Sequence, residues 1–263
     1  MYCADWYDLD SSQFRKATFY DRMKWSNSLD LSLKPYFAAS AYGGPVAVLN
    51  LSDREGRAVR SLVIAIYTSV GQLCGLVRWN HGPLHSIHWT QTEELLCVQN
   101  DGKVFVYDMF GAELEDGGHS QFGMGKEAQE TKIFEAQTFA SYAGQTGLAV
   151  LTKAYRLFLV NSVTDRKIWR TAEIPRRSEK PSCWTVAFKS KTVVLYVLGA
   201  DIYRLTQGEA AQQVVVPATQ VKQYVQIAVS SAREPRDCKV ALLSENGLVQ
   251  ILPWSMNHME VHN

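Results

Sequence analysis

The stretch Leu84–Gly111, LHSIHWTQTEELLCVQNDGKVFVYDMFG, contains two apolar strands joined by a tight turn. A short strand ending at Trp89 precedes the apolar run 95–98, and the turn 100–102 leads into the alternating strand 103–107. Asn-Asp-Gly between two apolar strands is a hairpin signal, because glycine readily adopts the positive φ that such a turn requires. The stretch therefore predicts one antiparallel repeat unit.

The same strand, turn and strand pattern recurs three more times along the chain. The copies lie at 148–160, 193–205 and 240–252, and the four turn centres fall near residues 101, 154, 200 and 246. Repeats of roughly 40 to 50 residues with four strands each are typical of β-propellers. The spacing predicts an all-β, WD-like β-propeller. The strands expected for an earlier blade are Phe37–Ala41, Val46–Leu49, Leu62–Tyr67 and Leu73–Trp79.

Three regions are expected along the chain. Residues 1–35 form an N-terminal arm that packs on the outside of the first blade, because its aromatic side chains need burial. Residues 36–252 form the propeller blades, and residues 253–263 form a divergent, polar tail. Residues 111–129, rich in glycine, are placed on an exposed outer strand and its loops, because helical periodicity is nearly absent.

Composition excludes several classes of function. The chain has 27 basic and 26 acidic side chains and a net charge of +1. Its net charge therefore does not attract it to nucleic acid or to an anionic bilayer. The longest apolar run, 62–66, is far shorter than the roughly 20 residues of a membrane helix. The N-terminus is acidic and the five cysteines are scattered singly, which favours a cytoplasmic protein with reduced thiols.

Candidate catalytic and metal-binding patterns are weak. His81, His85 and His88 cluster, but no cysteine or carboxylate accompanies them at ligand spacing, so a structural role is expected. The segment Gly117–Gly125 lacks the order of a phosphate-binding loop, and no helix is expected after it. No nucleophile elbow or enzymatic cysteine context occurs. The sequence predicts a protein that is not an enzyme and that needs no cofactor.

The densest basic cluster is the loop that carries Arg176, Arg177 and Lys180, with Lys189 and Lys191 nearby in the sequence. A loop projecting from a propeller could place these charges against acidic lipid headgroups or an acidic partner. The simpler interpretation is that these side chains are solvated and bind nothing, because each basic side chain adds only about 1 kcal/mol to the attraction to an anionic membrane.

Four strings of this sequence resemble a known family. They are AYGGPVAVL at 41–49, EELLCVQNDGKVFVY at 93–107, FGMGKE at 122–127 and PSCWTV at 181–186. Their order and spacing are similar to those in the N-terminal region of the vacuolar protein sorting-associated protein 16 family, over roughly residues 1–252. The resemblance implies a propeller of about seven blades, of which four to five can be traced here.

That resemblance also implies a function. Family members are core subunits of the HOPS and CORVET complexes, which tether endosomes and lysosomes or vacuoles before membrane fusion. The implied partners are the other subunits, and the implied location is cytoplasmic, peripheral on late endosomal, lysosomal or vacuolar membranes. The family carries a C-terminal α-helical solenoid that binds an SM-type SNARE-regulating subunit. No such solenoid occurs before Asn263, so this contact is not expected here.

Several alternatives stay open at this point. The chain is expected to be a fragment, a truncated gene model or a splice isoform with an unclosed ring, and exposed strand edges then predict poor solubility. Closure as a small four-bladed propeller is a second structural possibility. The alternative function is an independent propeller adaptor that binds a phosphoinositide or an acidic peptide at one face.

Overall fold

The computed structural model is almost entirely antiparallel β-sheet. It describes residues 6–10, 12–15, 24–25, 36–49, 62–114, 121–174, 179–214, 221–230 and 238–254. These residues form five propeller blades and one separate hairpin. Within the described ranges, no helix has the length and apolar character needed to cross a membrane.

Each blade is a meander whose strands pair in chain order. Blade 1 consists of β3 (Tyr36–Ala39), β4 (Val46–Leu49), β5 (Leu62–Tyr67) and β6 (Leu73–Trp79). Blade 2 consists of β7 (Leu84–Trp89), β8 (Leu95–Gln99), β9 (Lys103–Tyr107) and β10 (Gln121–Gly123). Blade 3 consists of β11 (Ile133–Ala140), β12 (Thr146–Thr152), β13 (Leu157–Val160) and β14 (Ile168–Arg170).

The remaining blades follow the same plan. Blade 4 consists of β15 (Cys183–Phe188), β16 (Thr192–Leu198), β17 (Asp201–Thr206) and β18 (Gln212–Val214). Blade 5 has three strands in the described residues, β19 (Tyr224–Val229), β20 (Lys239–Ser244) and β21 (Val249–Pro253). The four predicted hairpin repeats are therefore confirmed as blades 2 to 5, and the earlier set of predicted strands as blade 1.

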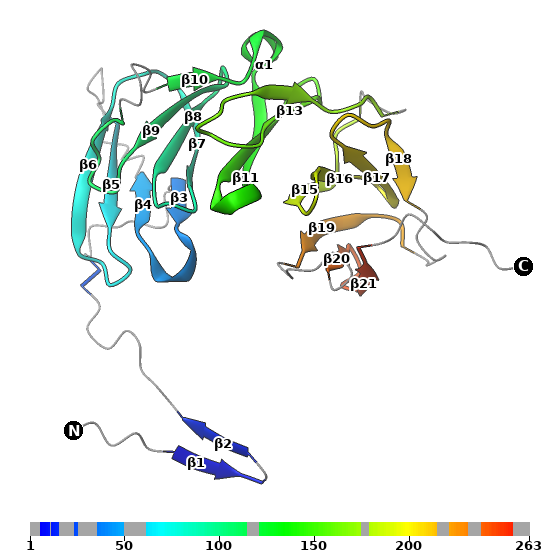
Figure 1. The fold of residues 1–263 in the computed structure, drawn as a ribbon, viewed down its shortest axis with the longest axis horizontal. Helices are drawn as coiled ribbons and strands as arrows, with labels where there is room; N and C mark the ends of the chain where they lie inside the picture. The colour runs from blue at the N-terminus through cyan, green and yellow to red at the C-terminus, as the bar shows by residue number, and fades with distance from the viewer. Residues whose placement is uncertain are drawn as a thin grey trace, which may run out of the picture.

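The blades lie along an open arc, with the first and fifth blades at its two ends (Figure 1). The innermost strands β3, β7, β11, β15 and β19 contact one another in this order. Within the described ranges, β19 makes no comparable contact with β3. The alternative of a closed four-bladed ring is therefore wrong, because a fifth sheet is present and the ring stays open.

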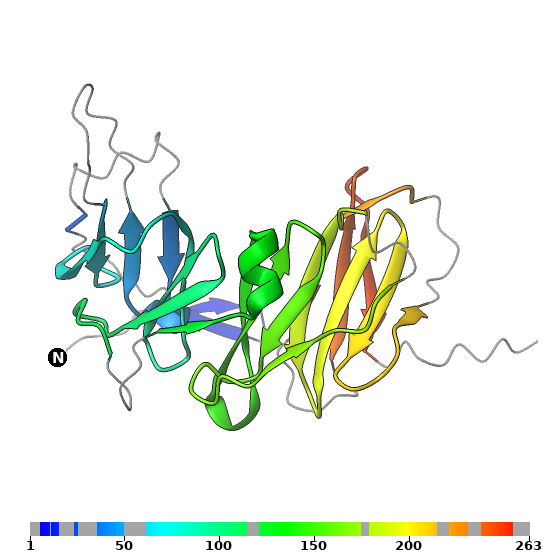
Figure 2. The same cartoon turned by 90° about the horizontal axis from the view of Figure 1, so that it is seen from above.

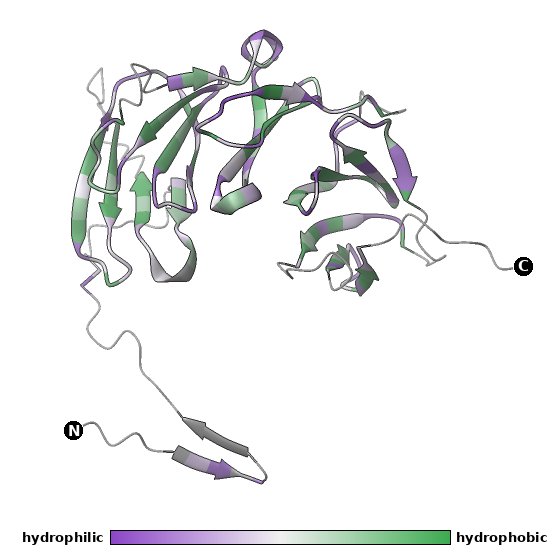
Figure 3. Cartoon of the chain, in the orientation of Figure 1, coloured by the Kyte–Doolittle hydropathy of each residue, from purple (hydrophilic) through white to green (hydrophobic). Residues whose placement is uncertain are grey.

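Hydrophobic side chains fill the space between neighbouring blades. Four clusters join blades 1 and 2, 2 and 3, 3 and 4, and 4 and 5. The second strands β8, β12 and β16 are buried along their whole length, because each lies between two other blades. Strands buried on both faces are apolar at successive positions. Figure 3 shows these hydrophobic strands and the more hydrophilic loops at their ends.

Four tryptophans pack between neighbouring blades. Trp79 and Trp89 belong to the cluster between blades 1 and 2, and Trp184 belongs to the cluster between blades 3 and 4. Trp169 is half-buried and packs against the same cluster as Trp184. The indole of Trp89 also donates a hydrogen bond of 3.0 Å to the backbone oxygen of Ala38 in blade 1. These residues stabilise the contact between blades 1 and 2 and the contact between blades 3 and 4.

One prediction for the segment after blade 2 is wrong. The outer strand β10 occurs as expected, but a short helix, α1 (Lys126–Thr131), begins directly after Gly125. Met124 and Ala128 are fully buried in the cluster between blades 2 and 3, so tertiary packing holds this turn in place. Six residues are too few to show helical periodicity in the sequence. Figure 2 shows α1, in green, in the middle of the row of blades.

The N-terminal residues touch the first blade at one described point. The backbone N–H of Lys24 donates to the oxygen of Val70 at 2.6 Å, and the ring of Trp25 lies 5.5 Å from that of Tyr67. Gly71, at φ +86°, permits this approach, since a Cβ there would lie 2.5 Å from the nitrogen of Trp25. The hairpin of β1 (Trp6–Leu9) and β2 (Ser12–Arg15) lies apart from the blades (Figure 1). Packing of the whole arm stays a prediction.

Candidate interaction surfaces

One end of the sheets collects the connections between blades and the turns between second and third strands. Strand pairing places them together, because each innermost strand begins opposite the end of its second strand, as in Leu84 opposite Gln99 and Ile133 opposite Thr152. We call this the turn end of the propeller. Loops on a rigid scaffold carry much of the binding chemistry in proteins, so ligand contacts are expected at the turn end.

A basic hollow lies at the turn end between blades 2 and 3. The cavity has a volume of about 320 Å³, and its lining residues are His81, Pro83, Gln99, Asn100, Asp101, Lys103, Lys132 and Lys153. Asp101 is the one carboxylate among them, and its Oδ2 lies 3.9 Å from Nζ of Lys103. We call this cavity the lysine pocket. A neighbouring hollow of about 490 Å³ shares Asp101 and Lys103 and adds Lys126.

Backbone hydrogen bonds hold the walls of the lysine pocket together. The N–H of Asn100 donates to Pro83 at 3.1 Å, and the oxygen of Asn100 accepts from Ile133 at 2.8 Å. The N–H of Lys153 donates to the oxygen of Lys132 at 2.9 Å. Four segments from two blades are thereby fixed relative to one another, which makes the pocket a pre-formed part of the fold.

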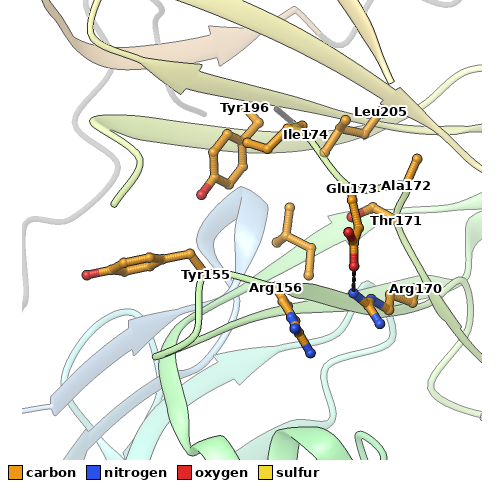
Figure 4. A pocket seen from close by; sticks show the side chains of 10 residues that line it. Tyr155, Arg156, Arg170, Thr171, Ala172, Glu173, Ile174, Tyr196 and Leu205 are labelled. Carbon is orange, nitrogen blue, oxygen red and sulfur yellow. Dashed lines mark hydrogen bonds and ion pairs between the residues drawn. The ribbon is translucent and has the colours of Figure 1, made fainter. Parts of the chain in front are cut away.

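A second cavity, between blades 3 and 4, is too small for a substrate. Its volume is about 20 Å³, enough for one water molecule. The charged side chains beside it are already paired, since Arg170 donates to Glu173 at 2.7 Å (Figure 4). Both Arg156 and Arg170 also pair with Glu127. These contacts connect α1 to blade 3. We assign the cavity a structural role.

The three clustered histidines have separate environments. The ring of His81 stacks on Phe105 with centroids 4.1 Å apart. Nε2 of His88 lies 2.9 Å from Oγ of Ser86, and burial lowers the pKa of His88 to about 4. Burial also lowers the pKa of His85, although its hydrogen bond with Asn100 acts in the opposite direction. The described part of the chain contains no group of three side chains suited to hold a metal ion.

Cys97 and Cys183 are poor nucleophiles. Burial raises the pKa of the Cys97 thiol, and burial followed by the charge of Glu135 raises the pKa of the Cys183 thiol to about 12. A thiol in this state carries almost no thiolate at neutral pH. Neither residue can therefore act as an activated nucleophile.

The basic cluster in the sequence does not form one described patch. Arg176 and Arg177 lie outside the described residues, so their role stays a prediction. Lys180 precedes β15 at the turn end, with Nζ 5.1 Å from the centroid of the Phe134 ring. Lys189 and Lys191 follow β15 at its other end, where Lys191 pairs with Glu209 at 2.7 Å. Lys180 therefore lies at the opposite end of β15 from Lys189 and Lys191, although the three are close in the sequence.

The lysine pocket was not found from the sequence. Its three lysines come from the start of β9, the connection before β11 and the turn between β12 and β13. No sequence run brings them together. The strand pattern contained the signal that could have located the pocket. An alignment of the repeats would place all three lysines at the turn end.

Blade 5 exposes an apolar surface on its far side. Val249 and Ile251 in β21 have exposed fractions of 59% and 67%, whereas Leu252 and Trp254 are buried against blade 4. Val225 in β19 of the same sheet and Leu248, in the turn before β21, are also exposed. Exposed apolar residues that gather on one sheet favour association with another surface.

We expect the double variant V249K/I251K to weaken self-association of the chain. Two charges on the edge strand β21 disfavour packing of a second copy on this sheet. Sedimentation velocity over a concentration series should show the apparent dissociation constant rise by about tenfold or more. The control is Tyr142→Lys, at an exposed aromatic residue in the connection between β11 and β12. Equal association of all three proteins would contradict the expectation.

Comparison with known proteins identifies relatives over most of the chain. The family model described as "Vps16, N-terminal region" matches residues 2–262. A Drosophila melanogaster protein, "Vacuolar protein sorting-associated protein 16 homolog", is 36% identical over 213 residues, covering 78% of this chain and 24% of the relative. The Arabidopsis thaliana "Protein VACUOLELESS1" is 27% identical over 216 residues, covering 76% and 24% respectively. The chain thus spans about a quarter of the length of these relatives.

Solved structures with similar folds are β-propellers of low sequence identity. The Myceliophteria thermophila "Cps50 (Swd1) beta-propeller domain" aligns with a TM-score of 0.52 at 10% identity, covering 82% of this chain and 63% of the other. Saccharomyces cerevisiae Sqt1 aligns with a TM-score of 0.51 at 13% identity, covering 83% and 59%. Both similarities support the propeller fold and carry no information on function.

Proposed function

The chain belongs to the Vps16 N-terminal region family, and on this premise we propose that it is a non-catalytic scaffold module of an endosome–lysosome or vacuole tethering complex. The observation that carries the proposal is the family match over residues 2–262. Relatives that match this chain are named for vacuolar protein sorting.

The described surfaces agree with a role in protein contacts. The blades offer a rigid frame, and blade 5 exposes Val249 and Ile251 to solvent. The small cavity between blades 3 and 4 is too small for a substrate, and Cys97 and Cys183 are not activated. Rigid surfaces with apolar and polar parts suit a subunit that binds other subunits.

We further propose which contacts this part of the family makes. The partners are the other subunits of HOPS or CORVET, which the blades contact directly, and the location is cytoplasmic and peripheral on late endosomal, lysosomal or vacuolar membranes. The contact with the SM-type SNARE-regulating subunit belongs to the helical solenoid of the family. We do not assign that contact to residues 1–263.

Expression of the chain in cells tests this function. If the blades occupy subunit contacts without the solenoid, the chain should compete with the full-length family member and slow delivery of endocytosed cargo to lysosomes. The measurement is the half-time of arrival of a fluorescent cargo in lysosomes. The control is a Trp184→Ala variant expressed at the same level, which should lose the effect with the fold. Normal delivery at high expression of the unmodified chain would contradict the proposal.

A further inference from the structure

We propose that the lysine pocket binds a compact, multiply phosphorylated group such as an inositol phosphate, through Lys103, Lys132 and Lys153. This inference goes beyond the scaffold function and does not depend on it. The site lies at the turn end between blades 2 and 3, and its lysines come from three separate segments of the chain.

The size of the pocket suits a small ring that carries several charges. Small-molecule sites have volumes of about 300 to 1,000 Å³, and the lysine pocket has about 320 Å³. Its walls are held by the backbone hydrogen bonds of Asn100 and Lys153. A ligand would therefore meet a site that needs little rearrangement, which lowers the entropic cost of binding.

The described residues do not balance the charge of the pocket. Asp101 faces Lys103, with 3.9 Å between Oδ2 and Nζ, and its Oδ1 accepts the backbone N–H of Lys103. Among the residues that the structure describes, neither Lys132 nor Lys153 has an ion-pair partner. Two uncompensated ammonium groups and a partly compensated third line one cavity. A multivalent anion is the ligand that such an arrangement attracts.

The backbone of Lys132 supplies an independent argument. This residue has φ 66° and ψ 157° at the end of α1. Residues other than glycine rarely adopt this region, and such strain concentrates at binding sites. A glycine would fit the backbone of this position better than lysine does. The chain therefore carries a lysine beside the pocket at a position whose backbone favours glycine.

The chemistry of the lining favours phosphate over a carboxylate peptide. Lysine is a common phosphate ligand that acts as a point charge, whereas bidentate recognition of a carboxylate or a phosphate favours arginine. No arginine lines the described lysine pocket. The backbone groups of Asn100, Lys132 and Lys153 cited above already have hydrogen-bond partners within the chain, so they are not available to pair with an extended peptide.

Calorimetric titration of the full chain with myo-inositol 1,4,5-trisphosphate tests the site. We expect saturable binding of one ligand per chain that weakens as the salt concentration rises. Lys103→Gln and Lys153→Gln should each weaken binding by about fivefold, the effect of one basic side chain at an anionic surface. The matched control is Lys167→Gln, an exposed lysine in the turn between β13 and β14. The absence of saturable binding, or equal losses in the control, would overturn the proposal.

The variant Lys132→Gly separates binding from stability. Removal of the side chain should weaken binding by about fivefold, while relief of the backbone strain should raise the urea concentration at the unfolding midpoint. A merely structural Lys132 would leave the affinity unchanged, and that result would overturn its assigned role. Because this variant is expected to fold at least as well as the unmodified chain, a loss of binding cannot be ascribed to unfolding.

Two further probes identify the source of the phosphate. Flotation with vesicles of phosphatidylcholine that contain phosphatidylinositol 4,5-bisphosphate would show that a lipid headgroup reaches the pocket. Binding of the soluble trisphosphate without flotation would assign the site to a free inositol phosphate. Either result, if lost in Lys132→Gly, supports the proposal. Tighter binding of a hexaglutamate peptide than of the trisphosphate would overturn it in favour of an acidic protein partner.

Discussion

Replacement of Trp184 by alanine is expected to lower the free energy of unfolding by about 4 kcal/mol, the typical cost of removing a buried aromatic side chain. Trp184 is buried between blades 3 and 4, and its indole N–H donates to Oε2 of Glu135 at 2.7 Å. Gln137 completes the contact by donating to both Glu135 and the backbone oxygen of Trp184. The substitution would leave a cavity, and the half-buried carboxylate of Glu135 would keep Gln137 as a donor but lose the indole N–H.

Urea unfolding followed by circular dichroism measures this effect. Because domains of this kind are stable by only about 5 to 15 kcal/mol, a loss of about 4 kcal/mol would remove a large share of the stability of the fold. Trp184→Phe is the matched control, since it keeps most of the packing and loses the hydrogen bond, at a cost of about 1 to 3 kcal/mol. Equal midpoints for the alanine variant and the unmodified chain would show that this contact does not join the blades.

Acidification is expected to destabilise the fold through His88. Its pKa is 6.5 in the unfolded chain and about 4 in the folded one, because burial disfavours the charged ring. Between these values the unfolded state binds more protons, so the free energy of unfolding falls as the pH is lowered from about 6.5 to about 4. The loss amounts to at most about 3 kcal/mol. Burial of His85 acts in the same direction.

The variant His88→Gln tests this pH dependence. Glutamine does not titrate, so the slope of unfolding free energy against pH between 4 and 6.5 should become smaller than in the unmodified chain. The control is His81→Gln. His81 is a half-buried histidine at the turn end, and its ring stacks on Phe105. An unchanged slope in His88→Gln would mean that other groups cause the acid sensitivity.

The blades could be predicted from the sequence because their strands and turns are local features. Asn100 and Gly102 specify a tight turn, and the apolar runs of β8, β12 and β16 reflect burial on both faces. Helix α1 could not be predicted, because it depends on burial of Met124 and Ala128 between two blades rather than on its own periodicity.

The candidate ligand site required the three-dimensional structure. Lys103, Lys132 and Lys153 are separated in the chain and meet through the pairing of strands in two adjacent blades. The sequence drew attention instead to residues that are close in the chain, such as Lys180 and Lys191, which β15 holds at opposite ends. A site formed by several repeats becomes visible when the register of the repeats is known.

The central claim is that these blades make contacts with tethering-complex subunits. Affinity purification of the tagged chain from cytosol, followed by mass spectrometry, tests it most directly, with a version extended through the family's helical solenoid purified in parallel. We predict that the other HOPS or CORVET subunits accompany the chain of 263 residues itself. Their recovery with the extended version alone would contradict the claim and assign assembly to the solenoid.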